Sequence, residues 1–172
     1  MNPEERAIVE RAERVATENL RRRGGPAAIQ IAHYRPDRSL EGQTLEQIAA
    51  ARKQSPVLAA LELIARQSPS IVSFNMAEDD IAELMKQPYT MTSSDGGLVA
   101  MGEGKPHPRN YGAFARKLAR YVRQRQVVSL EHAIRSMTSL PATVFGMRDR
   151  GVIREGAAAD IVIFDPAKVV DR

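Results

Sequence analysis

The sequence of 172 residues contains no cysteine. The chain therefore cannot form disulfide bonds, and it offers neither a thiol nucleophile nor a thiolate ligand for a metal ion. A chain without cysteine is compatible with the cytoplasm, which is the location we expect for this protein.

Long apolar runs are also missing. No apolar run approaches the roughly 18 to 20 residues that are needed to span a bilayer. The N-terminal stretch MNPEERAIVERAERVA is charged from its start, which is unlike a secretory signal. We therefore expect no association with a membrane.

Aromatic residues are scarce, since the chain has no tryptophan, four tyrosines and four phenylalanines. The net charge of +4 is modest, and Arg21–Arg23 is the only basic run. This run ends a predicted helix, where cations oppose the helix dipole favourably. Because basic and aromatic residues are not interleaved, we expect no nucleic-acid partner.

The remaining composition is that of an ordinary globular protein, with 43% hydrophobic and 27% charged residues. The length is sufficient for one domain with a hydrophobic core, or for a part of a larger domain.

Helices and strands are predicted to alternate in the N-terminal part. Helices are predicted over 3–23 and 77–86, the latter capped by Asn75 or a neighbour. Two further helices are predicted to begin at the capping box of Thr44 and at Ser55-Pro56. Strands are predicted over 27–34, 70–75 and 89–92. Alternation of this kind favours a parallel sheet with helices on its faces. Three strands cannot close a barrel, so we expect the chain to be part of a larger fold.

His33 lies at the end of the first predicted strand. No second histidine stands at the spacing of a zinc site. We therefore interpret His33 as incidental rather than as a metal ligand.

The C-terminal part predicts a helix over 111–125, a second helix capped by Ser129, and a short helix with Pro141 in its first turn. Its methionine and phenylalanine stripe is interpreted as core packing, and His132 as a surface residue. The run Ile161-Val162-Ile163-Phe164 is a predicted strand that must be buried or paired, because a free apolar edge promotes aggregation.

The stretch from Pro88 to Gly112 has the features of a functional site. A short β-prone run leads to Asp95, and a glycine-rich loop then leads to His107-Pro108-Arg109. Residues at the C-terminal ends of parallel strands line the crevice in which ligands bind. The alternative is that Asp95-Gly96 forms only a turn, since Asp-Gly is a common turn dipeptide.

Several separated motifs resemble one enzyme family. The tail from Gly151 to Asp165, GVIREGAAADIVIFD, looks like the segment by which amidohydrolases return from their barrel to a small β-sandwich. The motifs Leu40-Glu41-Gly42, Ser73-Phe74-Asn75-Met76, Ser94-Asp95-Gly96, His107–Gly112 and Met137–Ala142 resemble the N-acyl-D-amino-acid deacylases, or D-aminoacylases. The resemblance runs in order from the first predicted helix to the last residue.

The resemblance implies an α/β fold that is the C-terminal portion of a metal-dependent (β/α)8 barrel of the TIM type. Residues 1–148 would form the last strands and helices of the barrel. Residues 149–172 would begin the return into the β-sandwich domain and end in one of its strands. The N-terminal part of the barrel would then be supplied from outside these residues.

The resemblance also implies hydrolysis of N-acyl-D-amino acids, small molecules, by a zinc-activated water. Asp95 would be the general base. Arg109 would bind the substrate carboxylate, with a surface role as its alternative, and His107 would line the pocket or orient the loop. No histidine of the chain matches a metal-ligand position, so the zinc ligands are expected upstream.

Two other functions are compatible with the sequence. One is a different amidohydrolase, such as a cyclic-amide or dipeptide hydrolase. The other is a truncated chain without catalytic activity, and the isolated chain is expected to be inactive because it lacks a set of metal ligands.

Overall fold

The computed structural model describes residues 2–100 and 102–171. The chain has an α/β fold that divides into two compact units. The first unit comprises Met1–Asn75 and Val99–His107, and the second comprises Met76–Leu98 and Pro108–Arg172. Each unit is described separately.

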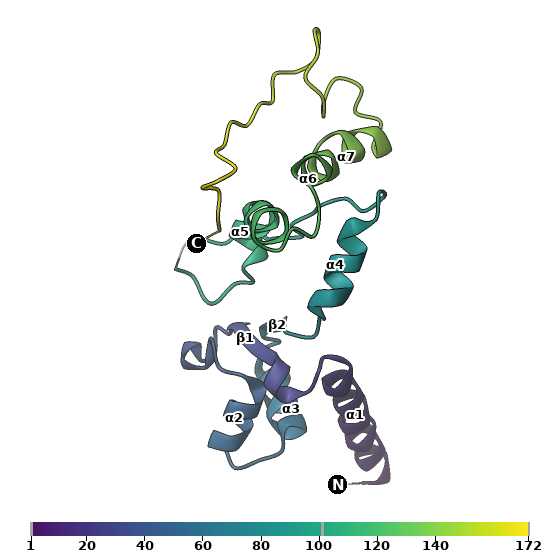
Figure 1. The fold of residues 1–172 in the computed structure, drawn as a ribbon. Helices are drawn as coiled ribbons and strands as arrows, with labels where there is room; N and C mark the ends of the chain where they lie inside the picture. The colour runs from purple at the N-terminus through teal and green to yellow at the C-terminus, as the bar shows by residue number, and fades with distance from the viewer. Residues whose placement is uncertain (1, 101, 172) are drawn as a thin grey trace. The chain divides into compact units, whose positions relative to one another are not determined.

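The elements of the first unit are α1 (Pro3–Arg22), η1 (Pro26–Ala28), β1 (Ile29–His33), η2 (Arg38–Leu40), α2 (Leu45–Ala51), α3 (Pro56–Arg66) and β2 (Ser70–Ser73). Those of the second unit are α4 (Glu78–Lys86), α5 (Arg109–Arg116), η3 (Lys117–Gln124), α6 (Leu130–Met137) and α7 (Ser139–Val144). All are labelled or can be traced by colour in Figure 1.

The predicted helices of the first unit are confirmed, and local side-chain chemistry explains where they begin. Asn2 and Glu5 form a reciprocal capping box at α1, and Thr44 forms one with Gln47 at α2. The hydroxyl of Ser55 accepts a hydrogen bond from the backbone N–H of Leu58 at the start of α3. These bonds satisfy N–H groups that have no partner within the helix.

The sheet consists of β1 and β2, which pair antiparallel with Ile31 opposite Ile71. The prediction of a parallel arrangement was wrong for these two strands. A single crossover helix returns the chain for parallel pairing, whereas here two helices, α2 and α3, lie between the strands. The additional helix reverses the chain once more.

The core of the first unit lies where β1, α2 and α3 meet. Its buried residues are Ile29, Ile31, Tyr34, Leu40, Leu45, Ile48, Ala49, Ala59 and Leu63. The buried hydroxyl of Tyr34 donates to the carbonyl oxygen of Leu63 at 3.2 Å, so the polar end of this ring is satisfied within the core.

A bulge interrupts β1 between Ile31 and His33. The carbonyl of Ala32 accepts a hydrogen bond from the backbone N–H of Lys105 at 2.7 Å. A Cβ atom on Gly104 would lie 2.7 Å from the same oxygen. The loop Val99–His107 therefore docks on the bulge through a contact that requires glycine at position 104.

The helices of the second unit were also predicted, but two details differ. The N-cap of α4 is Ala77, which makes no side-chain capping bond, so neither Asn75 nor a neighbour caps this helix through its side chain. The helix predicted over 111–125 is an α-helix up to Arg116 and a π-helix from Lys117. The backbone N–H of Arg125 accordingly bonds to the carbonyl of Arg120, five residues earlier.

The segment from Tyr89 to Thr92 forms no strand in the described structure. Its backbone instead attaches to α6, because the N–H of Thr92 donates to the carbonyl oxygen of Ser136 at 2.9 Å. The segment has β propensity, but no described strand pairs with it, so it does not form a strand.

The tail after α7 contains neither helix nor strand among its described residues (Figure 1). Ile161, Val162 and Ile163 are 60%, 82% and 94% exposed. The strand predicted at 161–164 is therefore absent from the structure, and its apolar side chains remain in water. The assignment of residues 149–172 to a β-sandwich stays a prediction.

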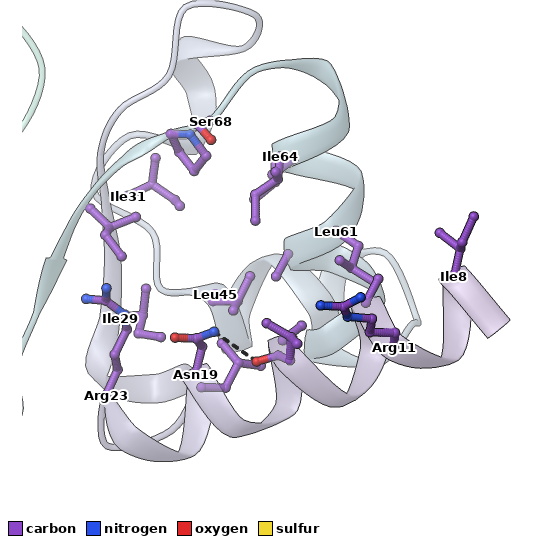
Figure 2. Close-up of a pocket in the computed structure, with 18 residues that line it drawn as sticks. Ile8, Arg11, Asn19, Arg23, Ile29, Ile31, Leu45, Leu61, Ile64 and Ser68 are labelled. Carbon is purple, nitrogen blue, oxygen red and sulfur yellow. Dashed lines mark hydrogen bonds between the residues drawn. The ribbon is translucent and has the colours of Figure 1, made fainter.

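An apolar groove of about 650 Å³ lies between α1, α3 and the sheet (Figure 2). Leu61 and Ile64 of α3 and Ile8 of α1 border it. Arg11 of α1 and Arg23, the C-cap of that helix, also line it. Helix α1 has no buried residue, so its apolar face is only partly covered. None of the described helices combines the length and the apolarity that crossing a membrane would need.

The capping box of α2 gives a test of the first unit. Thr44→Ala removes the hydroxyl that accepts the Gln47 N–H at 3.2 Å, and we expect the free energy of unfolding to fall by about 1 kcal/mol in urea denaturation. The control is Thr17→Ala. The Thr17 hydroxyl donates to the carbonyl oxygen of Glu13 within the exposed part of α1 and caps no helix end. Equal stabilities of the two variants would contradict a capping role for Thr44.

Candidate active site

Asp95 and Arg109 form an ion pair. The Arg109 Nη2 and Asp95 Oδ2 atoms are 3.1 Å apart, and the side chains are 45% and 81% exposed. Both groups are therefore accessible to a ligand. Arg109 is the first residue of α5 and follows Pro108 at the N-cap, so the helix start fixes its backbone.

The backbone of Asp95 has a positive φ of 46°. Aspartate and asparagine adopt this left-handed conformation more readily than other residues with a side chain. The next residue is held by a hydrogen bond from the Gly96 N–H to the Ser94 hydroxyl at 3.3 Å. Asp95 thus has a left-handed backbone within residues 90–100, to which neither a turn nor a bend is assigned, so the Asp-Gly turn that the sequence allows does not form there. Its carboxylate has a charged partner in Arg109.

Gly96 attaches the segment that carries Asp95 to α5. A Cβ atom at Gly96 would lie 2.9 Å from the Cα of Asn110 and 3.3 Å from the carbonyl oxygen of Arg109. A Cβ atom at Gly97 would meet nothing within 4 Å. The close backbone contact at Gly96 therefore brings Asp95 next to Arg109.

His107 is exposed and ends the segment Val99–His107, which belongs to the first unit. Asp95 and Arg109 belong to the second unit. The structure pairs the two charged candidates with each other, and the role of His107 stays a prediction.

His132, which we expected on the surface, is only partly exposed. Its Nε2 atom lies 3.1 Å from the carbonyl oxygen of Met85. The ring therefore links α6 to the end of α4. The sequence gives no sign of this contact, because the two residues are 47 positions apart.

His33 forms a pair with Glu41, and its Nδ1 atom lies 2.9 Å from Glu41 Oε1. The Glu41 side chain is 11% exposed, and the same oxygen accepts the N–H of Tyr34 at 3.0 Å. In the sequence, Glu41 stands out only as part of the motif Leu40-Glu41-Gly42. In the structure it holds the end of β1.

In a chain without cysteine, a zinc site needs three or four histidine, aspartate or glutamate side chains close together. Among the described residues, no group of three such side chains lies close enough to bind a metal ion. His33 and Glu41 lie together, but the Nδ1 and Oε1 atoms of this pair are in contact with each other at 2.9 Å. The described side chains therefore do not fit a zinc site by themselves.

Lys117 is a buried lysine that the sequence analysis missed. Its side-chain nitrogen donates to the Thr92 hydroxyl at 2.7 Å and to the Ser136 hydroxyl at 2.8 Å. Burial lowers the pKa of Lys117 below its usual value. The signal was present, since Lys117 follows Phe114 by three residues and precedes Tyr121 by four, which places it on the apolar face of the predicted helix.

The apolar groove of the first unit is a different kind of surface. Its lining residues include arginine, asparagine and serine but no carboxylate and no histidine. It therefore lacks a general base among these residues, and the charged candidates remain Asp95 and Arg109.

Comparisons with known proteins identify the family of the chain. The model of the amidohydrolase family matches residues 3–172. An N-acyl-D-glutamate deacylase from Alcaligenes xylosoxydans xylosoxydans is 39% identical over 144 residues, which are 84% of this chain and 28% of the relative. A D-aminoacylase from the same organism is 37% identical over 141 residues, covering 82% of this chain and 28% of the relative.

Solved structures give the same result. The N-acyl-D-glutamate deacylase from Bordetella bronchiseptica, complexed with zinc and a phosphonate mimic of the tetrahedral intermediate, has a TM-score of 0.78 and 38% identity. The match covers 89% of this chain and 31% of that chain. A structure concerned with the binuclear metal centre of D-aminoacylase has a TM-score of 0.73 at 38% identity, over 83% and 29% of the two chains.

The chain thus spans between a quarter and a third of the length of these relatives, with 28% for the first curated one and 31% for the first structure. The family model covers nearly the whole chain, and the relatives agree in sequence and in fold. The chain belongs to the amidohydrolase family.

Proposed function

We propose that this chain forms part of an enzyme that hydrolyses the amide bond of N-acyl-D-amino acids and releases a carboxylate and a free D-amino acid. The observation that carries the proposal is the Asp95–Arg109 pair, a carboxylate and a guanidinium 3.1 Å apart at the start of α5. The relatives, which are D-amino-acid deacylases, support this substrate class.

Asp95 is the proposed general base. Hydrolysis of an amide requires that a water molecule lose a proton and that the leaving nitrogen gain one. An accessible carboxylate can take the first proton and deliver it to the nitrogen. The exposure of Asp95 supports this role, since a water molecule and a substrate can both reach it.

Arg109 is proposed to bind the free carboxylate of the substrate. A guanidinium can hold a carboxylate through two parallel hydrogen bonds. In this structure Asp95 occupies the guanidinium, and an exposed pair of this kind contributes only about 0 to 1 kcal/mol. A substrate carboxylate can therefore replace Asp95 on Arg109 at little cost, which would free Asp95 to accept a proton.

Zinc is proposed to be held by residues outside this chain, because the described side chains do not form a site for it. The relatives support a role for metal, since one was crystallised with zinc. In the same way, residues 1–148 are proposed to complete a (β/α)8 barrel, and residues 149–172 a small β-sandwich. His107 is proposed to line the pocket or orient its loop.

The proposal is tested by the release of free amino acid from a panel of N-acetyl-D- and N-acetyl-L-amino acids, with zinc present and the complete enzyme that contains this chain. We expect turnover of the D forms, and Asp95→Asn should lower kcat about 100- to 10,000-fold. Asparagine tolerates the positive φ, so the loss would report the missing carboxylate.

The control for this substitution is Asp79→Asn, at an exposed position in the first turn of α4, and its kcat should stay near that of the wild type. Absence of turnover of every D substrate would overturn the proposed function. Normal turnover by Asp95→Asn would remove Asp95 from the mechanism.

Arg109→Lys tests the binding of the substrate carboxylate. Lysine keeps the charge but cannot make two parallel hydrogen bonds. We expect KM to rise about tenfold while kcat changes less, because the loss of a charged hydrogen bond weakens binding. An unchanged KM would show that Arg109 does not bind the substrate carboxylate and has only a surface role. Steady-state kinetics on the best D substrate decides between the two.

Two neighbouring glycines form a matched pair. Gly96→Ala introduces a Cβ atom only 2.9 Å from Asn110 Cα, whereas Gly97→Ala meets nothing within 4 Å. We expect Gly96→Ala to lower kcat at least tenfold, because a small displacement of a catalytic group has an effect of this size. Gly97→Ala should keep wild-type kinetics. Equal activity of the two variants would show that the contact at Gly96 does not position Asp95.

A further inference from the structure

Lys117 lies at the junction between α5 and η3, within one continuous helical run that begins at Arg109. It is only 5% exposed. Its side-chain nitrogen bonds to two hydroxyls, those of Thr92 and Ser136. These two hydroxyls also lie 3.0 Å from each other, so the three side chains form a closed cluster.

Placing the charged side chain of Lys117 in this buried cluster is unfavourable in free energy. Neither partner of Lys117 is a carboxylate, and a buried charge without an opposite charge is unfavourable. Because burial lowers the pKa of Lys117 in the folded chain relative to the unfolded chain, the unfolded chain holds the proton more tightly. Stability therefore rises with pH between the lowered pKa and the usual one. The ionisation of Lys117 therefore costs stability at pH values below its lowered pKa.

Thr92 connects the cluster to the segment that carries Asp95. It lies three residues before Asp95, and besides the bond from Lys117 it has a backbone bond to Ser136 at 2.9 Å. On the other side of Asp95, the backbone of Gly96 packs against Asn110 of α5. Asp95 therefore lies between two attachments: Thr92 is bonded to Lys117 and to Ser136 of α6, and Gly96 packs against α5.

We propose that Lys117 is a positioning residue for Asp95, which it holds beside Arg109 by fixing Thr92 to the helical run that starts at Arg109. This inference rests on the proposed function, in which Asp95 is the general base. The helical run then acts at two points: its first turn contacts Gly96 and carries Arg109, and Lys117 at its middle anchors Thr92.

A direct chemical role for Lys117 or Ser136 does not fit the geometry. A serine beside a lysine can serve as a nucleophile in other enzymes. Here Ser136 is only 1% exposed, and its hydroxyl donates to the carbonyl oxygen of Ala133 at 2.7 Å. A substrate cannot reach it, so the cluster acts through the position of Thr92.

The test uses the complete enzyme with Lys117→Met, Thr92→Val and the double variant. Methionine keeps the length of the lysine side chain without its charge, and valine keeps the shape of threonine without its hydroxyl. The control is Lys168→Met, because the side chain of Lys168 is 85% exposed. Three quantities are measured: thermal stability, hydrogen–deuterium exchange of the backbone amides in 93–97, and kcat with KM on the best D substrate.

We expect Lys117→Met to keep or raise the melting temperature, to speed exchange in 93–97 about tenfold and to lower kcat about tenfold with KM nearly unchanged. Because Lys117 acts through Thr92, the double variant should lose no more than Lys117→Met alone. Lys168→Met should match the wild type in all three measurements.

Two results would overturn the inference. One is a folded Lys117→Met with wild-type exchange and kcat. The other is a parallel fall of melting temperature and kcat with additive losses in the double variant, which would indicate a general structural role. Exchange is measured without substrate, so a wild-type enzyme that is inactive on the whole panel contradicts only the proposed function. The exchange rates then still decide whether Lys117 holds the segment 93–97.

Discussion

The arrangement of the candidate site depends on the close approach of the Gly96 backbone to the first turn of α5. The ion pair between Asp95 and Arg109 cannot provide this order by itself. An exposed pair contributes about 0 to 1 kcal/mol, whereas fixing the backbone of one residue costs about 1 to 2 kcal/mol. The backbone contact at Gly96 and the bonds of Thr92 must therefore order the segment that carries Asp95, and the ion pair follows from their geometry.

The first unit also contains a close backbone contact at a glycine. Gly104 approaches the carbonyl of Ala32 so closely that a Cβ atom would lie 2.7 Å from it, and the N–H of Lys105 bonds to that oxygen. A loop between Asp95 and Arg109 in the sequence is thereby attached to a β-bulge. In both units a glycine lets irregular backbone attach to a regular element, where a larger residue would separate the two.

The sequence predicted what depends on neighbours along the chain. Caps at Thr44 and Ser55 located the starts of helices, and the family resemblance identified Asp95 and Arg109, which the structure pairs. The parallel sheet was wrong, because pairing depends on how the helix pair α2–α3 reverses the chain. Helical periodicity places Lys117 on an apolar face, but it does not identify its partners Thr92 and Ser136, which lie 25 and 19 residues away. Contacts of such range follow from packing, which local periodicity does not encode.

The left-handed conformation of Asp95 also limits how this position can change during evolution or redesign. Most residues with a side chain lose about 1 to 2 kcal/mol in this conformation, so glutamate would start from a conformational disadvantage in addition to its longer reach. Asparagine fits but carries no charge, and glycine fits but carries no side chain. Aspartate is thus the residue that combines a proton-accepting group with this backbone. A different base would have to come together with a different backbone conformation at position 95.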